Sequence, residues 1–339
     1  MARVRVAVIM GGRSSEHDIS LASARSVVDA LDPERYDVRA VEIGQDGRWQ
    51  LEAGDAPAQI GEGGELLPVP ADRSSSPFEG VDVVFPVLHG PFGEDGTVQG
   101  FLELADVAYV GAGVTASALC MDKDLFKAVM RDKCVPVVDS VTVLDRHRDR
   151  VENPFGFPVV VKPARLGSSV GISIVRDPEE LAPAIELALE HDEKILLEEY
   201  VTGVEVECSV LGNEEPIASI PGEIVPLSSD WYDFSAKYDE GGMKLVVPPR
   251  LDGRTIARVQ ELAVAAFVAS DCEGMARVDF FVRENGDLVV NELNTIPGFT
   301  ATSVYAKLFE ASGIPYAELL DRLVELALER RDRRARLKY

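Results

Sequence analysis

Two alternating apolar runs on either side of Asn285-Gly286 constrain the fold more than any other feature of the chain, and they lie within residues 275–294. An Asn-Gly pair between such runs is a strong signal for a β-hairpin with a two-residue turn, because both turn positions need a positive φ. With that turn, Glu284 faces Asp287, and the register of the whole hairpin follows.

The same register brings two acidic side chains face to face. Asp279 lies opposite Glu292, and Arg277 lies opposite Asn294. Carboxylates in directly facing positions, with Cβ atoms roughly 5 Å apart, repel each other and destabilise the sheet. A bound cation would remove that repulsion, and two carboxylates with an amide oxygen suit Mg²⁺. The alternative is that Arg277 neutralises both acids in a surface cluster, and the hairpin alone leaves both interpretations open.

The first third of the chain alternates short β-rich runs with a helical stretch. We expect strands at 4–10, 38–43 and 81–88, with a helix at 16–31 after the first of them. This alternation is typical of a parallel α/β sheet. Segment 44–77 is rich in Gly, Pro, Ser and acidic residues, and we expect an irregular insertion or a lid-like loop there.

The length and the remaining pattern favour three α/β modules. With 339 residues the chain can form two or three domains, and we place the modules at 1–112, 113–199 and 200–339. The residues at 115–132 have helical spacing. The basic end of the chain, 329–338, is expected to be a solvated helix terminus.

The composition excludes several classes of protein. A net charge of −24 argues strongly against a nucleic-acid partner. No apolar run approaches the roughly 18 residues that a membrane span needs. The four cysteines and four histidines are dispersed, which disfavours a disulfide set or a zinc site. The first apolar stretch runs directly into Gly11-Gly12 without a cleavage site, so we expect a cytoplasmic protein.

A glycine- and serine-rich loop at 166–171 follows the expected strand that ends at Lys162. Small residues let backbone N–H groups approach phosphate oxygens, and the lysine adds positive charge. The loop does not match the P-loop signature, which opens a helix, since another strand is expected at 171–175. An ordinary glycine-rich hairpin is the alternative, and Lys123 by itself is only an exposed helical lysine.

Two expected helix starts are candidates for substrate binding. In the first, at 11–18, Ser15 and Asp18 form a capping-box pattern, and Glu16 lies at the carboxyl end of a strand, where it suits an ammonium group. An acid that favours the helix dipole is the commoner role. The second start, at 295–304, offers free N–H groups to a carboxylate, with capping alone as the alternative. The dinucleotide fingerprint G-x-G-x-x-G is absent.

Taken together, these segments resemble the D-alanine–D-alanine ligases of the ATP-grasp superfamily. The resemblance covers almost the whole chain and rests on eight segments in order: GGRSSEHDISL (11–21), LHGPFGEDGTVQG (88–100), MDK (121–123), VVVKPARLGSSVGI (160–172), EEYVTGVE (198–205), YDFSAKY (232–238), ARVDFF (276–281) and NELNTIPGFTATS (291–303). It implies an α/β fold of α+β modules: a substrate-binding domain with a parallel sheet, a central ATP-grasp subdomain with the phosphate loop, and a C-terminal subdomain with the lid and metal site.

The resemblance implies an ATP site in which two lysines and the phosphate loop contact the phosphates, and in which a pocket holds the adenine and ribose. The implied ATP-binding residues are Lys123, Lys162, Gly167, Ser169, Glu198, Tyr200, Val201, Glu205 and Lys237. Two Mg²⁺ ions, replaceable by Mn²⁺, would be bound by Asp279, Glu292 and Asn294. The chain departs from the family at Glu199, where some members carry a lysine near the adenine.

The resemblance also implies the substrate contacts. The ammonium group of the first D-alanine would be anchored by Glu16 and His89, and the carboxylate of the second by Ser303 and Val304. The first carboxylate attacks the γ-phosphate of ATP, and the second amine attacks the resulting acyl phosphate. The oxyanion formed in that second step would be stabilised by Arg277 and the Gly298 N–H.

A lid over the acyl phosphate is implied at 231–244, where it would exclude water. In the family Tyr238 hydrogen-bonds Ser168, which in turn meets Glu16. The pair Lys237-Tyr238 favours a dipeptide product over D-alanyl-D-lactate.

The expected partners are D-alanine and ATP, without nucleic acid or membrane, and the expected assembly is a homodimer. Two other functions are alternatives. The first is an ATP-grasp ligase that uses D-lactate or D-serine as its second substrate, against which Tyr238 and the Ser303-Val304 pair argue. The second is a nucleotide-binding regulator without catalysis, which would have no need of Arg277 as an oxyanion donor.

Overall fold

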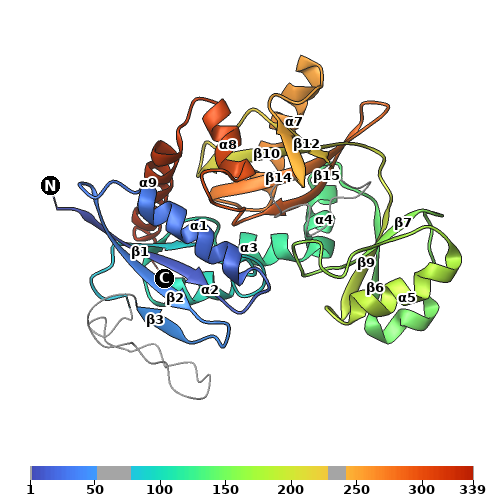
Figure 1. Cartoon of the computed structure of the whole chain (residues 1–339), viewed down its shortest axis with the longest axis horizontal. Coiled ribbons are helices and arrows are strands. Elements are labelled where there is room, and N and C mark those ends of the chain that lie inside the picture. Colours follow the sequence, from blue (N-terminus) through green and yellow to red (C-terminus); the bar gives the residue numbers. More distant parts are fainter. Residues whose placement is uncertain (1, 52–77, 228–241, 339) are drawn as a thin grey trace.

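The computed structural model describes residues 2–51, 78–227 and 242–338, which form three β-sheets that follow one another along the chain (Figure 1). The first sheet has the strand order β3-β2-β1-β4-β5, and all but its β3 edge is parallel, as predicted. Its strands and helices are β1 (Val4–Gly11), α1 (His17–Ala30), β2 (Tyr36–Ile43), β3 (Trp49–Leu51), β4 (Val83–Pro86), α2 (Thr97–Leu104) and β5 (Ala108–Tyr109). The expected irregular segment 44–77 thus contains a short strand, and its residues 52–77 lie outside the described part.

Both faces of the first sheet are covered, which explains why its central strand is almost wholly apolar. Along β1, Val6 and Val8 belong to the core cluster shared with α1, whereas Ala7 and Ile9 belong to the cluster shared with α2. The strand therefore ends between two helix layers, and its carboxyl end opens toward the loop that carries Glu16.

The second sheet is antiparallel and has the order β6-β9-β7-β8, with α5 packed against one of its faces. Its elements are β6 (Ser140–Leu144), a short 3-10 helix (Asp145–Arg150), β7 (Val159–Pro163), β8 (Ser173–Val175), α5 (Pro178–Leu189) and β9 (Lys194–Glu199). On β7, Val159 and Val161 are in the core under α5. Because side chains alternate, Val160 and Lys162 are on the opposite face.

The third sheet has the order β13-β12-β10-β14-β15, with β11 paired to β10, and α7 covers one face of it. Its elements are β10 (Gly203–Gly212), β11 (Ile217–Ala218), β12 (Gly222–Pro226), β13 (Met243–Val246), α7 (Gly253–Ala269), β14 (Gly274–Arg283) and β15 (Leu288–Asn294). The buried residues of α7 recur at helical spacing, as in Val259, Leu262, Ala263 and Ala266, which gives the helix one apolar face.

The stretch of helical spacing at 115–132 is helical, as predicted, but it is divided into α3 (Val114–Met121) and α4 (Lys123–Asp132). Asp122 ends the first helix and caps the second, accepting a hydrogen bond from the Leu125 N–H at 3.2 Å. The Lys123 N–H donates to the Ala164 carbonyl at 3.0 Å, so a contact with the segment directly after β7 fixes the break. As a result Lys123 begins a helix beside the phosphate loop.

The chain closes with α8 (Val304–Ala311) and α9 (Tyr316–Arg334), and α9 packs on the first sheet near α1 (Figure 1). The expectation of a solvated basic end is wrong for Arg330, which is buried. Arg330 donates to the Gly111 and Tyr109 carbonyls and stacks 4.2 Å from the centre of the Tyr109 ring. In the described part of the chain, every helix is too short or too polar to cross a membrane.

Candidate active site

The hairpin turn differs from the predicted one. The Arg283 N–H donates to the Asp287 carbonyl at 2.8 Å, so three residues form the turn, and Glu284 does not face Asp287. Among residues 275–294, all of which the structure describes, only Gly286 has a positive φ, at 86°. A two-residue turn of the predicted type needs positive φ at Asn285 as well, whereas a three-residue turn needs it only at its last position.

A β-bulge in β15 restores the predicted pairing beyond the turn. Phe280 pairs with Val290, but its neighbour Asp279 pairs with Glu292, so Asn291 is the extra residue. The predicted opposition of Asp279 and Glu292 is therefore confirmed, although two irregularities, and not one regular ladder, produce it. The bulge also places the Asn291 amide oxygen 3.3 Å from the Lys162 Nζ.

Three carboxylates stand in register across neighbouring strands, and we call them the carboxylate row: Glu207 on β10, Asp279 on β14 and Glu292 on β15. Glu207 and Asp279 are buried, and Glu292 is half-buried. Such facing acids repel one another, which favours a bound cation. The sequence reasoning missed Glu207. Its alternation with Glu205 marks a polar face of the strand, but only the pairing of β10 with β14 places it in the row.

Arg277 lies within the row and contacts two of its members. Its Nε and Nη2 each lie 2.7 Å from an oxygen of Asp279, and its Nε lies 3.0 Å from Glu207 Oε2. The Asn294 amide donates to Asp279 at 3.0 Å, and Lys123 Nζ lies 3.4 Å from Glu292 Oε2. Arg277 thus contacts Asp279, which is one of the two acids that the alternative interpretation assigned to it, and it also contacts Glu207.

The donor set fits a hard divalent cation. Carboxylate and amide oxygens, with phosphate oxygens and water, are the usual ligands of Mg²⁺. Within the described ranges, no group of three or more His, Cys, Asp or Glu side chains is arranged to hold a metal ion. The predicted metal site has only two carboxylates, Asp279 and Glu292. The Asn294 amide oxygen and oxygens of phosphate or water would therefore have to complete the coordination of the metal ion.

A second charged group, which we call the lysine cluster, consists of Lys127, Lys162 and Glu198. The Glu198 Oε1 lies 2.8 Å from Lys127 Nζ, and its Oε2 lies 2.7 Å from Lys162 Nζ. Burial by itself raises the pKa of Glu198, but the two ammonium groups outweigh it and hold that pKa below its usual value. Burial lowers the pKa of Lys127 to about 8.

Lys127 is the second residue that sequence reasoning missed, and helical spacing was the signal that could have found it. It lies one turn after Lys123 on the buried face of α4, together with Phe126 and Met130. Lys123 is itself buried and donates to the Leu166 carbonyl at 2.8 Å, so the view of it as an exposed lysine is wrong.

The phosphate loop leads into a strand, as predicted, and it lies against the first module. Ser168 and Ser169 have φ values of 55° and 58°, in the left-handed region that non-glycine residues rarely adopt. The Ser168 hydroxyl donates to the Glu16 carboxylate, and a Cβ on Gly167 would lie 3.8 Å from that carboxylate. Strain of this kind is concentrated at ligand-binding loops.

Glu16 occupies the N-cap position of α1 and is buried, but the predicted capping box is wrong. No side-chain capping bond forms there, and the Glu16 N–H donates to Ser14 Oγ at 3.3 Å. Gly90 approaches so closely that a Cβ on it would lie 2.8 Å from Glu16 Oε2, and its φ is 72°. The carboxylate is therefore enclosed by the phosphate loop on one side and the Gly90 loop on the other.

The buried His89 and the half-buried Glu94 join this loop to the segment after the hairpin. The His89 Nδ1 lies 2.9 Å from the Ile296 carbonyl, and burial lowers the pKa of His89 although Glu16 opposes that effect. Glu94 accepts hydrogen bonds of 2.8 Å from the Gly90 and Ile296 N–H groups, and burial raises its pKa to about 8. Glu94 was not predicted, although it lies in the segment 88–100.

The remaining predicted residues are found at three places. Ser303 is the N-cap of α8 and accepts a hydrogen bond from the Thr300 N–H at 3.0 Å, and Val304 begins that helix. A Cβ on Gly298 would lie 3.3 Å from Ser303 Oγ. Tyr200 and Val201 are half-buried in the connection from β9 to β10, where Glu205 follows. Lys237 and Tyr238, with most of the expected lid, lie outside the described residues.

The departure from the family at Glu199 has a structural partner. Glu199 forms an ion pair with Arg283 of β14 and accepts a hydrogen bond from the Asp139 N–H at 3.1 Å. It therefore links the second sheet to the third.

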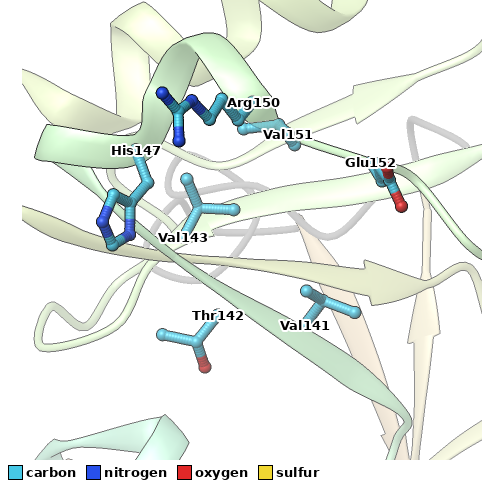
Figure 2. Close-up of a pocket in the computed structure, with 7 residues that line it drawn as sticks. All are labelled: Val141, Thr142, Val143, His147, Arg150, Val151 and Glu152. Carbon is cyan, nitrogen blue, oxygen red and sulfur yellow. The ribbon is translucent and has the colours of Figure 1, made fainter.

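A cavity of about 420 Å³ lies elsewhere, between β6 and the 3-10 helix that follows it (Figure 2). Figure 2 shows His147 and Arg150 on the helix, with Val141 and Thr142 on the strand beside it. Its lining residues, all within the described part of the chain, include none of the predicted site residues. The site is therefore defined by contacts between charged side chains.

Two family models match the chain. They are the D-ala D-ala ligase N-terminus over residues 5–112 and the D-ala D-ala ligase C-terminus over residues 130–325. A D-alanine--D-alanine ligase of Solibacter usitatus is 48% identical over 331 residues, which cover 97% of this chain and 96% of that protein. The D-alanine--D-alanine ligase A of Escherichia coli is 42% identical, with 97% of each chain covered.

Solved structures agree. A D-alanine-D-alanine ligase from Coxiella burnetii has a TM-score of 0.84 and 36% identity, covering 99% of this chain and 97% of that one. The VanG D-Ala:D-Ser ligase from Enterococcus faecalis has the same TM-score and identity, covering 96% and 100%. The predicted fold class, an α/β ATP-grasp fold with an N-terminal parallel sheet, is confirmed.

Proposed function

The chain belongs to the D-alanine–D-alanine ligase family and joins two D-alanines in an ATP-dependent reaction for peptidoglycan synthesis, and we propose how its residues divide that reaction. The reaction passes through a D-alanyl phosphate, so the enzyme must hold ATP, a carboxylate and an amine in line. Most of the rate acceleration in phosphoryl transfer comes from positioning and from neutralising charge.

Asp279, Glu292 and Asn294 would hold two Mg²⁺ ions, with Mn²⁺ as a possible substitute. When bound, these ions neutralise negative charge on the phosphates. The support is the carboxylate row, in which three acids face one another and two of them, Glu207 and Asp279, are buried. If Asp279 coordinated a metal ion, Glu207 would remain as a carboxylate partner of Arg277.

Lys123 and Lys162 would contact the phosphates, with the loop of Gly167, Ser168 and Ser169 closing over them. The support is that both ammonium groups are buried and that each lies within 3.4 Å of a side-chain oxygen of β15. The adenosine would bind beside the connection from β9 to β10. The residues proposed for it are Glu198, Tyr200, Val201, Glu205 and Lys237.

The ammonium group of the first D-alanine would bind to Glu16 with His89 nearby, and the carboxylate of the second would bind at Ser303 and Val304, where α8 begins. Attack of the first carboxylate on the γ-phosphate releases ADP. Attack of the second amine on the acyl carbon then releases phosphate.

Arg277 and the Gly298 N–H would stabilise the oxyanion of that second step. A lid that includes Tyr238 would exclude water from the D-alanyl phosphate, and its contact with Ser168 would join it to Glu16. The hydrogen bond between Ser168 and Glu16 supports this arrangement, because it already connects the phosphate loop to the first-substrate site.

One observation carries the proposal: the phosphate loop, the carboxylate row and Glu16 converge from three separate sheets. The test is Mg²⁺-dependent phosphate release from ATP with D-alanine, L-alanine, D-serine or D-lactate, each supplied alone and together with D-alanine, with the product identified by mass. We expect D-alanyl-D-alanine from D-alanine alone. A mixed D-alanyl-D-serine product would favour the second candidate, which the similarity to a D-Ala:D-Ser ligase raises. Absence of turnover with every substrate would refute catalysis.

The finer expectations on location and assembly are also proposals. A cytoplasmic enzyme is supported by the use of ATP, and a homodimer follows from the resemblance to the family. Sedimentation of the purified chain at several concentrations measures the assembly, and a monomer at every concentration would contradict the homodimer.

A further inference from the structure

Lys127 is the most deeply buried charged side chain of α4. Its side chain is 0% exposed, and its Nζ contacts two oxygens: Glu198 Oε1 at 2.8 Å and the Val138 carbonyl at 3.1 Å. Val138 in turn donates from its N–H to the Val290 carbonyl at 3.1 Å. Lys127 thus links α4 both to the second sheet and to the strand edge of the third.

Packing alone does not explain a lysine at this position. Its neighbours on the buried face of the helix are apolar, including Phe126 and Met130, and burial of an ammonium group carries a large desolvation cost. A buried ion pair is seldom more stabilising than apolar residues of the same volume. The position therefore calls for an explanation from function.

The geometry shows what the ammonium group does to its neighbours. Glu198 has one oxygen on Lys127 and the other on Lys162, so it is shared between two cations that come from different elements. Without Lys127, Lys162 would be the remaining ion-pair partner of Glu198 among the described residues. Lys162 could then bind a phosphate only by leaving a buried carboxylate without a cation, which is strongly unfavourable.

We propose that Lys127 is a positioning residue for the nucleotide: it keeps Glu198 paired and thereby leaves Lys162 available to the phosphates of ATP. The inference rests on the proposed ATP site and adds a residue to it that does not touch the nucleotide. Lys127 also supplies the second positive charge of the lysine cluster, so that the cluster as a whole is cationic and attracts an anion.

The test is the variant Lys127→Met, which keeps an unbranched side chain and removes the charge. We expect the KM for ATP, and the Kd for ATP measured without D-alanine, to rise by about 10- to 100-fold, because one charged contact is then withdrawn from the phosphates. The KM for D-alanine should change by less than about twofold. An unchanged KM for ATP would overturn the inference.

A matched control separates this effect from simple damage to the helix. Met130→Ala opens a cavity on the same face of α4 and should lower the melting temperature measurably. It removes no charge from the cluster, so the KM for ATP should stay within about twofold of the wild type. If Met130→Ala raises the KM for ATP as much as Lys127→Met does, the role of Lys127 is structural and the inference fails.

A double-mutant cycle tests whether Lys127 acts through Glu198. In a Glu198→Gln background the side chain that Lys127 holds is already uncharged, so adding Lys127→Met should change the Kd for ATP by less than about threefold. A further loss of about tenfold or more would overturn the inference. The same comparison serves if Lys127→Met alone does not fold, because the double variant removes both opposite charges together.

The failure of this inference is distinguishable from failure of the proposed function. If the wild type forms no dipeptide and binds no ATP, the proposed function is wrong whatever the variants do. If the wild type is active and Lys127→Met binds ATP equally well, only the role of Lys127 is wrong.

Discussion

The lysine cluster and the carboxylate row are both buried charge groups, but their compositions are opposite. The first is one carboxylate between two ammonium groups on α4, β7 and β9, and the second is three carboxylates in register on β10, β14 and β15. The positive charge of the lysine cluster therefore complements the phosphates of a nucleotide, and the negative charge of the carboxylate row complements a metal ion bound to it. The comparison shows that the folded protein already holds a positively charged site for phosphate and a negatively charged site for a metal ion before either ligand binds.

The two groups are also joined. Lys123 contacts Glu292, and Lys162 contacts Asn291 in the bulge of the same strand. The side chains that would hold phosphate thus already lie against those that would hold metal. Four substitutions test how far the two groups differ, from the largest expected effect to the smallest.

Asp279→Ala removes the central member of the carboxylate row. We expect kcat to fall by about a thousandfold, because charge neutralisation by the metal supplies several kcal/mol to phosphoryl transfer. Steady-state turnover over a Mg²⁺ titration measures this. The exposed hairpin residue Glu284, replaced by alanine, is the control and should retain wild-type activity. Full activity in Asp279→Ala would show that the row binds no catalytic metal.

Glu198→Gln removes the carboxylate of the lysine cluster and leaves two buried ammonium groups. We expect the free energy of unfolding at pH 7 to fall by about 3 kcal/mol. The pKa of Glu198 in the folded protein is below its ordinary value of 4.5, so its stabilisation is present above that pH and is lost as the pH falls through the folded-state pKa. The difference between variant and wild type should therefore shrink below pH 4.5 in denaturant titrations.

The control for this prediction is Glu310→Gln at an exposed position, which should leave the pH dependence of unfolding close to that of the wild type. A difference between Glu198→Gln and wild type that stays constant from pH 7 to pH 3 would contradict the role given to the ionised carboxylate.

Lys162→Met removes one ammonium group from the lysine cluster. We expect the KM for ATP to rise by about 30-fold, since a charge-assisted contact to phosphate is lost. The exposed Lys133, replaced by methionine, is the matched control. If the KM for ATP stays at the wild-type value while the KM for D-alanine rises, Lys162 contacts D-alanine and not ATP.

Gly286→Ala alters the hairpin turn far from both groups. Gly286 has a φ of 86°, and no atom lies within 4 Å of the place where a Cβ would be. The cost is therefore backbone strain alone, about 1 kcal/mol in the free energy of unfolding. The Mg²⁺ dependence of kcat should not change. A large loss of activity would show that the turn, and not the bulge, holds the register of the carboxylate row.

The hairpin at 275–294 was predicted correctly in part. The pattern correctly predicted a hairpin and the opposition of Asp279 and Glu292. It was wrong about the turn, and it contained no signal for the bulge at Asn291. The two deviations cancel in register, because a longer turn shifts the pairing by one residue and the bulge shifts it back.

The residues that were missed share a physical reason. Lys127, Glu207 and Glu94 each make their decisive contact with a residue distant in the chain: Glu198, Arg277 and Ile296, respectively. The same reason explains Arg330, whose buried contacts with Tyr109 and Gly111 depend on α9 returning to the first sheet.

By itself the sequence determined the local elements and the residue types of the site, because side-chain periodicity and turn chemistry act over a few residues. It also determined that a metal and a phosphate group are the ligands to expect near the hairpin and the glycine-rich loop. Only the tertiary structure decided which charges meet, since the pairing of β10, β14 and β15 and the docking of α4 join residues far apart in the chain. Burial then makes those few contacts decisive, because a charge removed from water must have a partner.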